Sequence, residues 1–261
     1  MNYWPIADLL ASPYTPLLAY PQRDRASQHQ RIEILKQLGI AGIYAAGSNH
    51  FEQVPILGMG YRGVVLLGHS PALNPAGGQV AIKLRRQDAP LDTLNREAQM
   101  LQWANQIAIG PKLYKSHPDV LVMAHCAGQP LERWLHQPPP PEQVQNAIAQ
   151  ILHQAYQLDR LGLDHGELGC VTEHVQVDPA KQTITLLDFG SASGDRRAAN
   201  VTTVAQGLFI GTQLAPRLAQ ILPIPERSRL IAALRAYKQA SNPRTFCALL
   251  AEIGLNSRIS I

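Results

Sequence analysis

Five groups of residues in this chain have the types and spacing needed to bind a phosphorylated ligand and a metal ion. In sequence order they are Gly58, Gly60 and Gly63, then Lys83, then Glu97, then His165 with Glu167, and finally Asp188. Glycines allow backbone N–H groups to approach phosphates, lysine neutralises their charge, and carboxylates bind Mg²⁺. The chemistry that this set predicts is the binding of a nucleotide phosphate with its metal.

The residues after the glycines distinguish between two kinds of glycine-rich nucleotide loop. In a dinucleotide-binding fingerprint, a helix follows the glycines directly. Here Val64–Leu67 is strand-like, and a loop at 71–78 and a second strand at 79–84 come next. The glycines are therefore predicted to lie in a β-hairpin. The sequence contains no G-x-x-x-x-G-K-[S/T], which excludes a Walker-type phosphate loop.

The predicted strands and helices indicate where Lys83, Glu97 and Asp188 lie in the fold. Lys83 ends an apolar strand that reads Val-Ala-Ile-Lys, and Glu97 falls inside a helix predicted at about 91–105. A lysine beside an apolar strand usually extends to the surface. Glu97, 14 residues after Lys83, supplies a helical carboxylate that would instead hold the lysine in place to bind phosphates. Asp188 follows the apolar strand 184–187 and precedes Phe-Gly, a place from which a carboxylate can bind Mg²⁺.

In this order the motifs resemble the eukaryotic-type protein kinase domain, in particular the small archaeal and bacterial predicted Ser/Thr kinases near the RIO kinases. The resemblance covers roughly residues 54–210 and leaves both ends poorly covered. It implies an α+β, two-lobed protein kinase-like fold with ATP between the lobes. The expected parts are an N-terminal extension at 1–50, a β-rich N-lobe at 51–123 and a short helical C-lobe at 124–261.

The resemblance also implies a role for each residue. The residues expected to bind ATP are Gly58, Gly60, Gly63, Val65, Ala81, Lys83, Met123, Ala124 and Cys126. Met123 would be the gatekeeper, and residues 124–126 the backbone that meets adenine. Glu167 would orient or deprotonate the acceptor hydroxyl, and Lys83, Glu97 and His165 complete the catalytic set. Asp188 would bind Mg²⁺, or Mn²⁺ in its place.

The chain departs from the kinase pattern at the catalytic loop and after it. Kinases carry Asp where Glu167 stands, and no Asn follows five residues later. The second metal ligand therefore stays open among Thr172, Glu173 and His174. Only 71 residues follow Gly190, without Ala-Pro-Glu, which indicates a trimmed C-lobe similar to that of the RIO group. The hydroxyls predicted as autophosphorylation sites are Ser191, Ser193, Thr202 and Thr203.

Three functions are compatible with these motifs. The first is an ATP-dependent atypical Ser/Thr protein kinase with an unknown protein substrate. The second, favoured by the change at Glu167, is a nucleotide-binding pseudokinase that acts as a partner-binding switch. The third is a small-molecule phosphotransferase of the aminoglycoside or choline kinase kind, for which the C-lobe is short.

Composition sets limits on partners and compartment. The chain has 261 residues, 46% hydrophobic and 16% charged, with a net charge of +4. This charge fits an ordinary soluble surface. The alternative is attraction to phosphates, which leaves nucleic acid open as a partner and is supported locally by Lys83, Arg85, Arg86, Arg196 and Arg197. Three cysteines without CxxC spacing favour a reducing, cytoplasmic location. No signal peptide and no apolar run of membrane-spanning length are seen, so no membrane partner is expected.

The remaining elements are predicted from hydrophobic periodicity. Residues 1–24 are expected to form an extended arm, and residues 27–38 a helix that Gly39 ends. A long amphipathic helix is expected at 142–161, ending at Gly162, with short strands near 175–177 and 184–187. Further helices are predicted at 201–221, 226–239 and 243–253.

Overall fold

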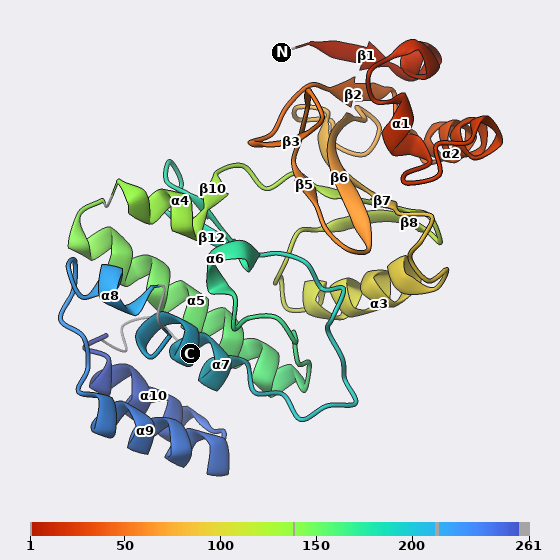
Figure 1. The fold of residues 1–261 in the computed structure, drawn as a ribbon. Helices are drawn as coiled ribbons and strands as arrows, with labels where there is room; N and C mark the ends of the chain where they lie inside the picture. Colours follow the sequence, from red (N-terminus) through yellow and green to blue (C-terminus); the bar gives the residue numbers. More distant parts are fainter. Residues whose placement is uncertain (1, 138, 212–213, 256–261) are drawn as a thin grey trace. The chain divides into compact units, whose positions relative to one another are not determined.

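The chain forms two compact units, each with its own core (Figure 1). The computed structural model describes residues 2–137, 139–211 and 214–255. One unit contains the residues up to Asn105 together with Pro111–Cys126, and the other contains Gln106–Gly110 and the residues from Ala127 onward. Helices and antiparallel strands are both abundant, which confirms the α+β class. Residues 1–50 belong to the same unit as residues 51–123.

The first unit is built on an antiparallel sheet. Among the described residues this sheet has seven strands in the order β1-β2-β6-β7-β9-β8, with β5 paired to β6. Their bounds are β1 Tyr3–Pro5, β2 Gly42–Tyr44, β5 Gly58–Met59, β6 Gly63–His69, β7 Gln79–Arg85, β8 Leu113–His117 and β9 Val120–Ala124. A separate hairpin joins β3 Asn49–Phe51 to β4 Val54–Ile56. The predicted glycine hairpin is thus formed by β5 and β6.

Four helical elements accompany this sheet. They are the 3-10 helix η1 Ile6–Ala11, α1 Thr15–Leu18, α2 Arg25–Gln37 and α3 Thr93–Asn105. The Asp24 side chain caps α2 by accepting a hydrogen bond from the backbone N–H of Ser27 at 2.8 Å. Gly39 adopts a left-handed φ of 82° just after the helix, as a C-terminal glycine does. The helix predicted at 27–38 is therefore confirmed, with slightly earlier bounds.

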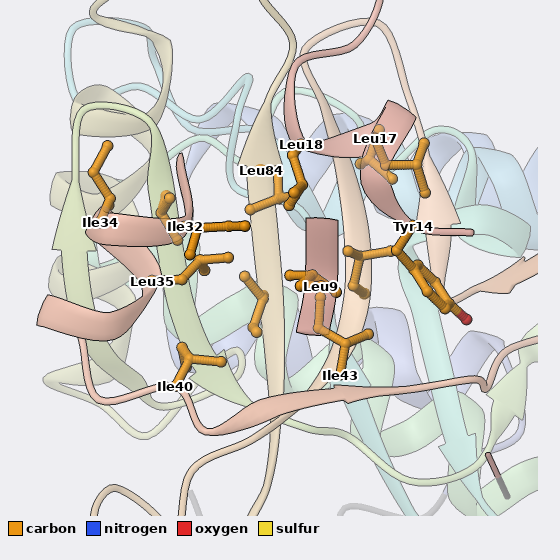
Figure 2. Close-up of a cluster of buried hydrophobic side chains, with 14 of the residues drawn as sticks. Leu9, Tyr14, Leu17, Leu18, Ile32, Ile34, Leu35, Ile40, Ile43 and Leu84 are labelled. Carbon is orange, nitrogen blue, oxygen red and sulfur yellow. The ribbon is translucent and has the colours of Figure 1, made fainter. Parts of the chain in front are cut away.

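The N-terminal elements cover one face of the sheet. Leu9, Leu17 and Leu18 gather with Ile32 and Leu35 over the strand that carries Leu84 (Figure 2). The strands contribute alternate residues to this core, namely Val64 and Leu66 of β6, Val80, Ile82 and Leu84 of β7, and Val120 and Val122 of β9. Because successive strand residues point to opposite faces, the residues between them occupy the other face.

The expectation of an extended arm at 1–24 is wrong. Within the described part of this segment the strand is confined to Tyr3–Pro5, and η1 and α1 follow it. Leu9, Tyr14, Leu17 and Leu18 are almost fully buried. The prolines hid this arrangement because they disrupt helical periodicity, yet Pro16 is well tolerated in the first turn of α1.

Leu35→Ala tests whether the N-terminal elements are part of the core. Leu35 is 0% exposed in α2, so the substitution is expected to lower the free energy of unfolding by about 2–5 kcal/mol. Leu91→Ala is the matched control, because Leu91 is 72% exposed and its change should stay within about 0.5 kcal/mol. Urea denaturation followed by circular dichroism measures both. Equal effects of the two substitutions would mean that α2 does not stabilise this unit.

The second unit is mainly helical. Its helices are α4 Leu131–His136, α5 Pro141–Leu161, α6 Val171–His174, α7 Asn200–Phe209, α8 Ala215–Leu218, α9 Arg227–Gln239 and α10 Pro243–Glu252. A small antiparallel sheet joins β10 Gln129–Pro130, β11 Val175–Asp178 and β12 Thr183–Leu186. Helix α5 runs through the unit and packs against α7 and β12 (Figure 1). Gly162 ends α5 in a left-handed conformation, as predicted.

One helix prediction in this unit is wrong. A single helix was expected at 201–221, but α7 ends at Phe209 and α8 begins at Ala215. Residues 212 and 213, inside the predicted span, lie outside the described residues. The helices predicted at 226–239 and 243–253 are found as α9 and α10. Among the described helices, none combines the length and apolarity that crossing a bilayer requires.

Candidate functional site

Lys83 and Glu97 form a buried ion pair in the first unit. Lys83 lies on β7 and Glu97 on α3, and Lys83 Nζ is 2.7 Å from Glu97 Oε1. Both side chains are less than a tenth exposed. Glu97 shares the inward face of α3 with Leu94, Ala98 and Leu101, all of which are buried. The predicted pairing is therefore found, and it fixes the lysine side chain against the sheet.

The glycine hairpin lies beside this pair in the sheet. The backbone N–H of Gly60 donates to the carbonyl of Gly63 at 2.9 Å and closes the turn. A Cβ at Gly63 would lie 2.9 Å from the Leu84 carbonyl, so close packing on β7 explains this glycine. A Cβ at Gly58 or Gly60 would meet nothing within 4 Å. Packing therefore does not explain these two glycines, and there is open space where a side chain at either position would lie.

Three predicted ATP-binding residues share one face of the sheet with Lys83. Val65 of β6 pairs directly with Lys83, and Ala81 lies two residues before it on β7. Met123 of β9 pairs directly with Ala81. Directly paired residues of antiparallel strands point to the same face, which here is the face opposite the N-terminal elements. The sheet thus aligns a small and two larger apolar side chains next to the lysine.

The remaining two predicted ATP-binding residues come at the end of β9. The Ala124 backbone N–H donates to the Lys112 carbonyl at 2.8 Å. Cys126 is half-buried, and its thiol contacts the Ala124 carbonyl at 3.9 Å. Between them, burial lowers the pKa of His125.

In the second unit, Glu167, His174 and Asp188 bring their side chains together. One ligand atom from each lies within 4.8 Å of the other two. His174 ends α6, and its Nε2 is 3.7 Å from Glu167 Oε2. Asp188 follows β12 and has a left-handed φ of 63°, uncommon for a residue with a side chain. Of the candidates for a second ligand, His174 belongs to this cluster, whereas Glu173 is exposed and Thr172 lies partly buried on α6.

The second oxygen of Glu167 is held by a serine. Ser191 Oγ donates to Glu167 Oε1 at 2.6 Å. The segment that carries Glu167 and the segment that carries Ser191 are joined by an antiparallel bridge. In this bridge Asp164 and Ser193 exchange backbone hydrogen bonds of 2.9 and 2.8 Å. Gly166 is required here, because a Cβ on it would lie 2.5 Å from the Ser191 carbonyl. The Gly in His-Gly-Glu therefore lets the two segments approach.

His165 is buried beneath this cluster. Its ring lies 4.8 Å from that of Phe189 and 5.9 Å from that of His174. Burial, followed by the charge of His174, lowers the pKa of His165 to about 4, so the imidazole is neutral at pH 7. A neutral ring carries its proton on Nε2, because the Leu187 carbonyl, 3.1 Å away, can only accept. His165 thus ties the His-Gly-Glu segment to Leu187, the residue before Asp188.

Asn200 and Asp159, which the sequence did not single out, fix the segment before Glu167 to the neighbouring helices. The Asn200 side chain accepts from the His165 backbone N–H at 2.9 Å and donates to the Leu163 carbonyl at 2.8 Å. Asp159 of α5 accepts from the backbone and the side chain of Asn200 at 2.7 and 2.9 Å. Burial raises the pKa of Asp159, against the hydrogen bonds that lower it. Asp159 also accepts from the backbone N–H of Val201 at 3.2 Å, so a residue of α5 serves the first N–H groups of α7, a contact that no local sequence pattern signals.

A scan against protein-family models and a search of the curated proteins found no match to this chain. The kinase resemblance therefore depends on the motifs quoted above. What the chain does must be inferred from its own residues and their geometry.

Proposed function

We propose that the chain is an atypical, ATP- and Mg²⁺-dependent protein kinase that transfers the γ-phosphoryl group to a protein hydroxyl. In this proposal the two units are the lobes of a protein kinase-like fold. The Lys83–Glu97 pair carries the proposal, because a lysine held in place by a carboxylate, on the face of the sheet opposite the N-terminal elements, is suited to bind phosphate. Its place behind a glycine hairpin with two uncovered glycines supports the same role.

The acidic cluster of the second unit fits a divalent cation. Glu167 and Asp188 offer carboxylate oxygens, which suit Mg²⁺, and His174 offers an imidazole, which suits Mn²⁺ better. The bound ion would neutralise phosphate charge during transfer. Glu167 Oε2 lies toward His174 and is the oxygen that would bind the cation. Glu167 Oε1 accepts the hydrogen bond of Ser191 and is the oxygen that would take the proton of an acceptor hydroxyl.

A nucleotide-binding pseudokinase is the second candidate. The observation that favours it is Glu167 itself, which stands where kinases carry the shorter Asp. Both candidates require ATP binding, and they differ in whether the γ-phosphoryl group leaves ATP. Transfer is mainly a matter of positioning and charge neutralisation, so a carboxylate of different reach does not by itself abolish it.

The test combines binding with transfer. ATP with Mg²⁺ is expected to raise the melting temperature of the purified chain, and labelled γ-phosphate should appear on dephosphorylated casein. Asp188→Asn should reduce the shift, because the cation loses a ligand. Saturating ligand at about 100 times its Kd stabilises a protein by about 2.7 kcal/mol, which is readily measured. Asp195→Asn, an exposed aspartate of the same segment, is the control and should behave as wild type.

The outcomes separate the candidates. A melting shift with transferred label supports the kinase, and a shift without transfer in either Mg²⁺ or Mn²⁺ supports the pseudokinase. A wild-type melting curve that millimolar ATP and Mg²⁺ leave unchanged contradicts both.

A further inference from the structure

Four hydroxyl side chains lie between Asp188 and the end of α7, and their hydrogen bonds differ. Thr202 and Thr203 on α7 both donate to the Ala199 carbonyl, at 2.9 and 2.8 Å. Ser193 Oγ accepts from the Asp195 backbone N–H at 3.1 Å. Ser191 alone among these four donates to a carboxylate, that of Glu167. The hydroxyl in contact with Glu167, the proposed catalytic base, is therefore that of Ser191, a residue of the same chain.

The contact between Ser191 and Glu167 has the geometry of an acceptor hydroxyl on a general base. The distance from Oγ to Oε1 is 2.6 Å, within the range from which a base takes a proton. Ser191 is partly buried and cannot swing freely, because its backbone is held from two sides. Arg196 donates to its carbonyl and also binds Asp164 at 2.8 Å, and the bridge at Ser193 fixes the next residues.

We propose that Ser191 is the chain's own phosphate acceptor, modified in cis; this inference rests on the proposed kinase function. In the step, a bond forms between Ser191 Oγ and the γ-phosphorus of ATP, and the bond from that phosphorus to the bridging oxygen of ADP breaks. The Ser191 proton passes to Glu167 Oε1, and ADP leaves with the bonding electrons. The products are phosphoserine, ADP and a proton that Glu167 releases to water.

Phosphorylation of Ser191 would lower the chain's own transfer activity. A phosphoserine carries about −1.5 to −2 charges at pH 7 and would lie against the Glu167 carboxylate. Like-charge repulsion would displace the base from its position, while the half-exposed Arg196 guanidinium, already bound to the Ser191 carbonyl, offers the new phosphate a partner. A single phosphate at Ser191 thus reduces transfer to other acceptors.

The experiment follows phosphate on the full-length chain. Protein treated with phosphatase and then freed of it is incubated with ATP and Mg²⁺, and phosphopeptides are mapped by mass spectrometry. Phosphate is expected at Ser191, at a first-order rate that does not change when the protein is diluted, as a reaction in cis requires. Ser191→Ala should lose this label, whereas Ser193→Ala, a neighbour without a carboxylate contact, should keep it. Ser191→Thr keeps the hydroxyl and should retain label on Thr.

Other results overturn the inference. Transfer to casein with no phosphate at residue 191 contradicts the self-acceptor and leaves the proposed function standing. Label at Ser191 whose rate rises with protein concentration contradicts the reaction in cis. No transfer to any acceptor, together with no stabilisation by ATP, contradicts both proposals. Melting curves of the three variants show whether each is folded.

Discussion

Glu167→Gln is expected to reduce phosphoryl transfer by about 100-fold or more. Stabilisation by ATP and Mg²⁺ should fall no further than in Asp188→Asn, because each variant removes one carboxylate from the proposed cation site. A general base contributes about 10²–10⁴-fold to a rate, and the amide cannot take a proton from the acceptor hydroxyl. The amide can still accept the hydrogen bond from Ser191, so the local structure should persist. Initial rates of labelled phosphate transfer to casein measure the effect.

Glu167→Asp distinguishes between two hypotheses. Either the loop geometry requires glutamate for transfer, or the chain is a kinase that lost activity when glutamate replaced aspartate. The shorter side chain withdraws the carboxylate by roughly 1 Å, and misplacement on this scale can cost about 100-fold in rate. The 2.6 Å contact with Ser191 and the approach to His174 both need the longer reach, so we expect Glu167→Asp to slow transfer. Faster transfer by the aspartate variant would instead indicate decay from an ordinary kinase.

The neighbouring Glu173→Gln is the matched control for both substitutions. Glu173 is exposed on α6 and lies outside the cluster, so its variant should transfer phosphate at the wild-type rate. If Glu167→Gln and Glu167→Asp also transfer phosphate at the wild-type rate, Glu167 is not the catalytic base.

Sequence reasoning succeeded where a pattern is local. The pairing of Glu97 with Lys83 follows from one strand, one helix and the spacing between them, and it is present at 2.7 Å. The hairpin around the glycines was likewise readable from the strand-like residues that follow them. The roles assigned to these residues stay predictions, because they depend on a ligand.

The contacts that sequence reasoning missed join segments far apart in the chain. Asp159 and Asn200 are 41 residues apart, and no periodicity links them. Glu167 and Ser191 are 24 residues apart, and their contact depends on the bridge between Asp164 and Ser193. The prediction for residues 1–24 failed for another reason. The helical turns of η1 and α1 are too short to show a periodicity, and they are stabilised by burial and by local hydrogen bonds such as that from Ser12 Oγ to the Leu9 carbonyl.

Lys83→Met is expected to have the largest effect on stability, and this effect can be measured without any ligand. Removing one partner of a buried ion pair typically costs about 3–5 kcal/mol, because the other charge stays buried. Glu97 is 2% exposed and would stay on the inward face of α3. Urea denaturation of the ligand-free chain measures the loss.

An exposed pair on the same helix provides the control. Arg96, the residue before Glu97, binds Asp92 at 2.6 Å, and both side chains are more than half exposed. Arg96→Met should therefore cost about 1 kcal/mol at most. Equal losses for Lys83→Met and Arg96→Met would show that burial adds nothing to the Lys83–Glu97 pair.

The double variant Lys83→Met with Glu97→Leu separates stability from function. Replacing both members of a buried pair by apolar residues is often neutral or stabilising, so much of the lost stability should return. Stabilisation by ATP and Mg²⁺ should nevertheless be absent from both the single and the double variant, because neither has a lysine to bind phosphate. ATP-dependent stabilisation that survives in the double variant would remove Lys83 from the nucleotide site. Stability that returns in the double variant without any ATP-dependent shift would show that the Lys83–Glu97 pair serves binding and not folding.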